Sequence, residues 1–175
     1  MGQLGQHLVP ARAALIPALT QAYADEWFAQ YNYWFVVNTL SGPAAPAVAS
    51  CMRQKARRAL VHANRLAGRI AELGGQPVAK LTELVQHATD KSFKLPADVR
   101  DLDGVLKAVL DAERTSIRTY QRLYEHTRDT DPITQALALE LLTEAGRGEA
   151  QLERLLGAPA PELSGQSSSP PASPA

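Results

Sequence analysis

Apolar side chains recur at steps of three and four residues over four long stretches of the chain, and no stretch alternates as a β-strand would. Glycine and proline fall almost entirely between these stretches, for example at 41–43 and 74–77. The pattern predicts four long helices, at about 10–40, 45–73, 102–128 and 132–156. Asp131 followed by Pro132 is typical of a helix start, with a capping side chain and proline in the first turn.

A stretch of about 25 residues between the second and third helices contains short helical patches and Pro96. It is long enough to cross the whole length of a bundle. The sequence therefore predicts an all-α four-helix bundle over residues 1–157, with a long crossover between the second and third helices. Residues 158–175 are mostly proline, serine and alanine, a composition that predicts a disordered tail.

Composition narrows the function classes. The 175 residues include 18 basic and 18 acidic side chains, so the chain lacks the field of a general nucleic-acid or anionic-membrane binder. A single cysteine, Cys51, excludes a disulfide within the chain and a cysteine-based zinc cluster. No signal-peptide pattern or membrane-length apolar run is present. We expect a cytoplasmic protein without a membrane or nucleic-acid partner.

The basic run 53–58 predicts a solvated helix face, and contact with phosphate or an acidic partner is the alternative.

Three ionisable residues interrupt the apolar stripes that face the bundle axis. Glu26 lies on the first helix, His62 on the second and Glu113 on the third. Buried charge is costly unless it is paired or bound to a metal. One explanation is a metal site formed by these three residues. The other is a Glu26–His62 pair, with Glu113 neutralised by an arginine such as Arg58 or Arg147.

Four segments resemble the ferritin-like superfamily, in particular bacterioferritins and Dps-like mini-ferritins with a bacterioferritin-type di-iron site. The resemblance covers all four helices and lies in EWFAQYNYW (26–34), ALVHANRLAGRIAELGGQP (59–77), DAERTSIRTYQRL (111–123) and LLTEAGRGEAQLERLL (141–156). It implies a ferritin-like bundle that assembles with copies of itself, into a shell in its relatives, and iron as the metal.

In that family a Glu from the first helix, a Glu-x-x-His motif from the second, a Glu from the third and a second Glu-x-x-His from the fourth hold two irons. Glu26, His62 and Glu113 match this pattern position by position. Small residues stand at the other three positions, namely Ala59, Ala145 and Gly148. The register of the fourth helix stays open, because a one-residue slip would bring Glu144 or Glu149 closer to the site. The resemblance therefore implies a depleted centre, with a single or weakly held iron and weak or no ferroxidase activity.

The small residues predict a pocket bordered by Glu26, His62 and Glu113, filled by water, by one metal ion or by Arg147. Leu60 stands where the family's haem-binding methionine would be, so no haem is expected.

Three functions stay open: an iron-binding or iron-storage protein, alone or in a shell with an active ferritin-like paralogue; a metal-free structural or interaction protein; and a small-ligand binder. An aromatic flank on the first helix either forms a subunit interface or covers the bundle's own core; its members are Trp27, Phe28, Trp34 and Phe35.

Overall fold

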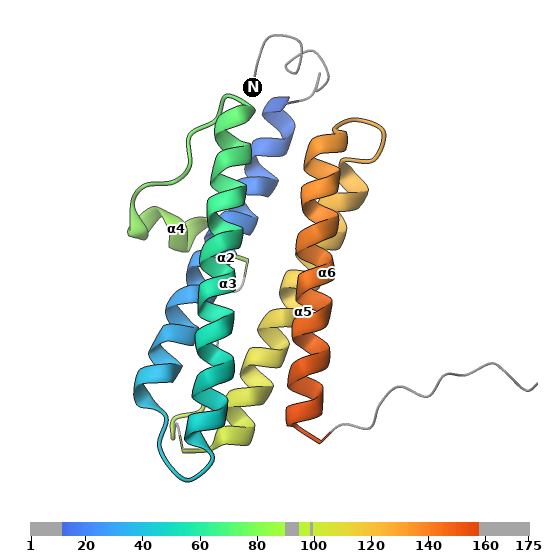
Figure 1. Cartoon of the computed structure of the whole chain (residues 1–175). Coiled ribbons are helices and arrows are strands. Elements are labelled where there is room, and N and C mark those ends of the chain that lie inside the picture. The colour runs from blue at the N-terminus through green and yellow to red at the C-terminus, as the bar shows by residue number, and fades with distance from the viewer. Residues whose placement is uncertain (1–11, 90–94, 99, 158–175) are drawn as a thin grey trace, which may run out of the picture.

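The computed structural model describes residues 12–89, 95–98 and 100–157 (Figure 1). Within them it contains the short helix α4 (Leu81–His87), four long helices and no strand; the long helices are α2 (Arg12–Thr39), α3 (Ala45–Glu72), α5 (Leu102–His126) and α6 (Pro132–Leu155). The all-α prediction is confirmed, and the predicted bounds agree to within about two residues at each end. The predicted tail, 158–175, lies outside the described residues. Among the helices described, none combines the length and apolar character of a membrane span.

Two antiparallel helix pairs form the bundle. Helix α2 packs along α3 and α5 packs along α6, and the pairs meet through α2–α5 and, less extensively, α3–α6. The connection after α3 runs from one end of the bundle to the other before α5 begins, and α4 lies within it beside α2 (Figure 1). This is the crossover that the sequence predicts.

Local signals explain where helices begin and end. The Asp131 carboxylate accepts from the backbone N–H groups of Ile133 at 3.1 Å and Thr134 at 3.0 Å, as predicted for the start of α6. The same carboxylate accepts two bonds from the buried Arg69 guanidinium, at 2.8 and 2.9 Å. After α2, Gly42 has a φ of 104°, which side-chain-bearing residues rarely adopt. Glycine therefore lets the chain reverse direction there.

The core consists of two apolar clusters separated by a polar layer. One cluster includes Leu19, Leu66, Ile70 and Leu141, and the other includes Val36, Met52, Val109 and Leu152. Most predicted inward residues are buried, among them Ala145 and Gly148, so the structure fixes the register of α6. Leu155 is an exception. It follows the buried Leu152 by three residues and so belongs to the same stripe, but it is 46% exposed because it occupies the last turn of α6.

Side chains of α3 reach α6 mainly through polar contacts. Five of them, spread along α3, bond to α6: Lys55 to the Gly148 carbonyl, Arg58 to the Glu144 carbonyl, His62 to the Glu144 carboxylate, Arg65 to Glu140, and Arg69 to Asp131. This side of the bundle is thus closed by hydrogen bonds and ion pairs.

Candidate functional site

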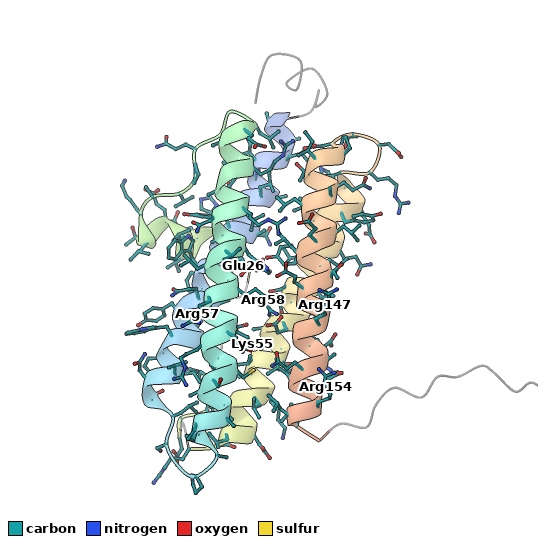
Figure 2. The ribbon with its side chains drawn as sticks, in the orientation of Figure 1. Glu26, Lys55, Arg57, Arg58, Arg147 and Arg154 are labelled. Carbon is teal, nitrogen blue, oxygen red and sulfur yellow. The ribbon has the colours of Figure 1, made fainter. Side chains whose placement is uncertain are left out.

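The polar layer between the apolar clusters contains side chains from three helices. Glu26 of α2, Lys55 and His62 of α3, and Glu113 of α5 are each at most 5% exposed. Figure 2 shows Glu26, Lys55 and Arg58 within the bundle between the helices. The cavity that these side chains border has a volume of about 10 Å³, which is room for about one water molecule.

His62 joins two carboxylates. Its Nδ1 lies 3.2 Å from Glu26 Oε1, its Nε2 lies 2.9 Å from Glu144 Oε2, and the Tyr120 hydroxyl donates to the same Glu26 oxygen. Burial lowers the pKa of His62, but hydrogen bonds and charges from Glu26 and Glu144 outweigh it and raise the pKa above its usual value. A carboxylate can only accept, so an imidazole that donates from both nitrogens satisfies both partners. The arrangement therefore fits a protonated His62.

Glu113 is neutralised by two cations. Its Oε1 accepts from Lys55 Nζ at 2.7 Å and from Arg58 Nη2 at 2.5 Å. Lys55 also donates to the Gly148 carbonyl at 3.3 Å, and Arg58 to the Glu144 carbonyl at 3.2 Å. Burial lowers the pKa of Lys55, and the charge and hydrogen bond of Glu113 offset this only in part. The centre of the bundle thus holds positive charge that the protein itself supplies.

Small residues provide the space for this ion-pair cluster. A Cβ added at Gly148 would lie 2.6 Å from Glu113 Oε2 and 2.7 Å from Arg58 Nη2. Ala59 and Ala145 line the cavity. The volume that the sequence analysis assigned to a pocket is therefore largely taken up by Lys55 and Arg58. Arg147, the arginine considered for this role, is exposed on α6 (Figure 2).

Two tyrosines border the same cavity with their hydroxyl groups neutral. Burial raises the pKa of Tyr33 well above its ordinary value, and the charges of Glu113 and Glu26 raise it further. Burial also raises the pKa of Tyr120 well above its ordinary value, and the charge of Glu26 raises it further. Tyr120 also contacts a candidate ligand directly, because its hydroxyl donates to Glu26.

The three candidate metal ligands do not form one group. Glu26 contacts His62, whereas Glu113 is engaged with Lys55 and Arg58. In the described part of the chain, no three histidine, cysteine, aspartate or glutamate side chains are arranged to hold a metal ion. A two-iron centre does not fit these residues, because two cations already share the Glu113 oxygen and alanines stand at 59 and 145, where the resemblance implies the bridging carboxylates.

Lys55 is the contributor that sequence reasoning missed. It was included in the basic run 53–58, which we expected to be solvated, yet it is 2% exposed. A signal was present, because Lys55 and Arg69 lie seven residues before and after His62. Residues seven apart share one face of a helix, so both point into the same seam.

Comparison with known proteins defines the family. The family model described as ferritin-like domain matches residues 16–159. This chain belongs to the ferritin-like family. Over 142 residues it is 31% identical to the DNA protection during starvation protein of Pyrococcus furiosus, and the match covers 81% of this chain and 76% of that relative.

Solved structures agree with that family. A Bacteroides fragilis bacterioferritin-related protein, described as a dodecameric thioferritin, is 29% identical, with a TM-score of 0.79, 83% of this chain covered and 86% of the other. Dps from Thermosynechococcus elongatus is 18% identical with a TM-score of 0.76, covering 93% of this chain and all of its own, a likeness of fold alone. The predicted ferritin-like fold and family resemblance are confirmed.

Proposed function

We propose that this ferritin-like chain is a shell subunit whose core centre is closed by its own ion pairs. By itself it binds iron weakly and has little or no ferroxidase activity. One observation carries the proposal: Lys55 and Arg58 meet at a single oxygen of Glu113, 2.7 and 2.5 Å away, where the resemblance places a metal ligand.

Electrostatics explains why these cations oppose iron. Fe(II) at Glu113 would have to displace Lys55 and Arg58, and Lys55 would then be buried without a counter-charge. Breaking a buried ion pair costs about 3–5 kcal/mol. At about 1.4 kcal/mol for each tenfold change, this lowers iron affinity by about two to four orders of magnitude.

The contacts of His62 with Glu26 and Glu144 also disfavour metal binding. To bind iron, His62 would have to release a proton and give up one of its two carboxylate partners, Glu26 or Glu144. A mononuclear site formed by Glu26, His62 and Glu113 remains a prediction, and it requires both halves of the layer to rearrange.

Self-assembly is the second part of the proposal. The Bacteroides relative is described as dodecameric, and this chain exposes aromatic and aliphatic side chains on α2 and α4. In such a shell, rapid iron oxidation would come from a paralogous subunit with an intact centre. The small-ligand alternative has less support, because the core cavity has room for about one water molecule.

Oxidation of Fe(II) in air tests the closed centre. Ferric-ion formation is followed by absorbance for the purified full chain, for a His62→Ala, Glu113→Ala double variant and for buffer alone. We expect the three traces to coincide within a factor of about two. Wild-type protein that clearly outpaces both controls would overturn the proposal.

A gain-of-activity variant tests why the centre is closed. Ala59→Glu, Ala145→Glu and Gly148→His restore the family pattern, while Lys55→Met and Arg58→Ala remove the two cations. We expect this variant to oxidise Fe(II) at least about tenfold faster than wild type, which corresponds to about 1.4 kcal/mol of barrier. The matched control carries the three restored ligands and keeps both cations, and it should stay slow. Circular dichroism confirms that both variants are folded.

A further inference from the structure

Helix α3 carries more positive charge than the bundle neutralises. Between residues 45 and 71 it has no acidic side chain and six basic ones: Arg53, Lys55, Arg57, Arg58, Arg65 and Arg69. Four of these contact acidic partners inside or across the bundle. Arg53 and Arg57 stay exposed. Inside the bundle, Lys55 and Arg58 share the carboxylate of Glu113, while His62 lies between the carboxylates of Glu26 and Glu144, so the buried charges balance and the exposed arginines carry the excess.

Helix α6 carries two further exposed arginines, Arg147 and Arg154. Its nearby acids, Glu149 and Glu153, are engaged with Arg114 of α5 at 2.8 and 2.9 Å. Within the described part of the chain, Arg57, Arg147 and Arg154 have no ion pair or side-chain hydrogen bond. Figure 2 shows Arg57 on α3, and Arg147 and Arg154 on α6, in the halves of these helices that lie toward the α2–α3 loop. We call Arg57, Arg147 and Arg154 the arginine face.

Cross-helix contacts set the spacing of the arginine face. Lys55 bonds to the Gly148 carbonyl and Arg58 to the Glu144 carbonyl, so residues 55–58 lie level with 144–148. Arg57 and Arg147 therefore stand at about the same height on two helices that pack less closely than α2 with α3 or α5 with α6. Arg154 follows Arg147 by two helical turns, about 10 Å along α6. The three guanidinium groups thus span more than one phosphate group can reach.

We propose that the arginine face binds a short inorganic phosphate chain. A guanidinium group presents several N–H donors in a planar fork that matches phosphate oxygens, and it stays charged at every physiological pH. Three such groups without acidic partners favour a ligand with several negative charges. Several linked phosphates also suit the spread of the face better than a single orthophosphate does.

The charge pattern favours a short anion over a DNA duplex. In the other half of the same two helices, Arg65 pairs with Glu140, and Arg69 with Glu72 and Asp131. Glu72 and Glu140 have side chains 49% and 61% exposed, so a long polyanion laid along the helices would meet carboxylates there. A short chain of phosphates would contact only the half of α3 and α6 in which the exposed arginines have no acidic partners.

Calorimetric titration of the full chain with sodium tripolyphosphate tests the proposal. We expect binding that weakens as salt is added, because exposed charges are screened. Arg147→Ser with Arg154→Ser should raise the Kd at least about tenfold. The control, Arg118→Ser with Arg122→Ser, removes two exposed arginines from α5 and should leave the Kd unchanged. All four positions are exposed, so melting temperatures should stay close to wild type.

Parallel titrations with orthophosphate and with a short DNA duplex identify the ligand. Weaker binding of both, compared at equal phosphate concentration, supports the proposal. It is overturned if wild type does not bind tripolyphosphate, if the Arg147→Ser, Arg154→Ser variant binds as wild type does, or if the duplex binds more tightly through the same two arginines.

Discussion

At Glu113 one carboxylate oxygen accepts from a lysine and an arginine, at a position where the family resemblance implies a metal ligand. A lysine ammonium group and a metal ion both supply the positive charge that a buried carboxylate needs. The ammonium is covalently attached, so it is present at every iron concentration. A fixed cation can therefore neutralise Glu113 without a metal ion.

Removing the charge of Glu113 should destabilise the protein strongly. Glu113→Gln leaves Lys55 buried without a counter-charge, so we expect the free energy of unfolding to fall by about 3–5 kcal/mol. The control Glu149→Gln removes a half-buried partner of Arg114 that lies at the bundle surface, and it should cost less than about 1 kcal/mol. Urea denaturation measures both. Equal losses in the two variants would mean that the buried cluster contributes no more than a surface pair.

Two glycines of α6 provide a matched pair. At Gly148 a Cβ would lie 2.6 Å from Glu113 Oε2, whereas at Gly146 it would meet no atom within 4 Å. Gly146→Ala should raise the free energy of unfolding by about 0.5–1 kcal/mol through helix propensity. Gly148→Ala should lower the free energy of unfolding by about 1–3 kcal/mol, because the buried Glu113–Arg58 ion pair would have to move away from the new methyl group. Urea denaturation measures both variants. If Gly148→Ala stabilises the protein as Gly146→Ala does, the Glu113–Arg58 ion pair can shift at little cost.

At the scale of helices, the apolar pattern was enough to predict the four long elements, because a 3.6-residue period and Gly/Pro breaks are local signals. It also placed Glu26, His62 and Glu113 on buried faces. The partners of these residues were harder to predict, because a long lysine or arginine side chain can turn inward or outward from a given position. Lys55 turns inward because Gly148 and Ala145 leave room on α6, a fact of tertiary packing.

The start of α6 should give a pH-dependent stability. Burial raises the pKa of Asp131, but hydrogen bonds from Thr134 and Arg69 outweigh it, and the pKa falls below its ordinary value of 3.8. A carboxyl group with a lowered pKa in the folded state contributes stability above pH 3.8, and this is lost as the pH falls below that value. Asp131→Asn should cost about 1.5–3 kcal/mol near neutral pH, and the difference from wild type should shrink below pH 3.8 in urea melts.

Asp101 of α5 is the control for this prediction. It also caps a helix, accepting from the Gly104 N–H at 2.9 Å, but it is exposed and contacts no buried arginine. Asparagine caps helices about as well as aspartate, so Asp101→Asn should change stability by less than about 0.5 kcal/mol. A pH-independent loss at Asp131→Asn would contradict the assigned role of the Arg69 pair.

For the whole molecule, the exposed apolar side chains of α2 and α4 mark the surface best suited to contact between subunits. Tyr31, Leu81 and Val85 are 60%, 74% and 45% exposed, and they line a groove of about 440 Å³. Of the predicted aromatic flank, Trp27 and Phe28 pack partly against the core, whereas Trp34 and Phe35 are exposed. Contiguous exposed apolar surface of this kind is typical of an interface.

A charge placed in this groove should therefore dissociate the proposed assembly. Leu81→Glu introduces a carboxylate that would have to lose its water in a subunit contact, a cost of several kcal/mol. We expect light scattering coupled to size-exclusion chromatography to show a smaller particle than wild type, with unchanged helical content. Ile133→Glu alters an exposed apolar residue at the start of α6, 42% exposed, and should leave the mass unchanged. If Leu81→Glu assembles as wild type does, subunits do not contact one another through α4.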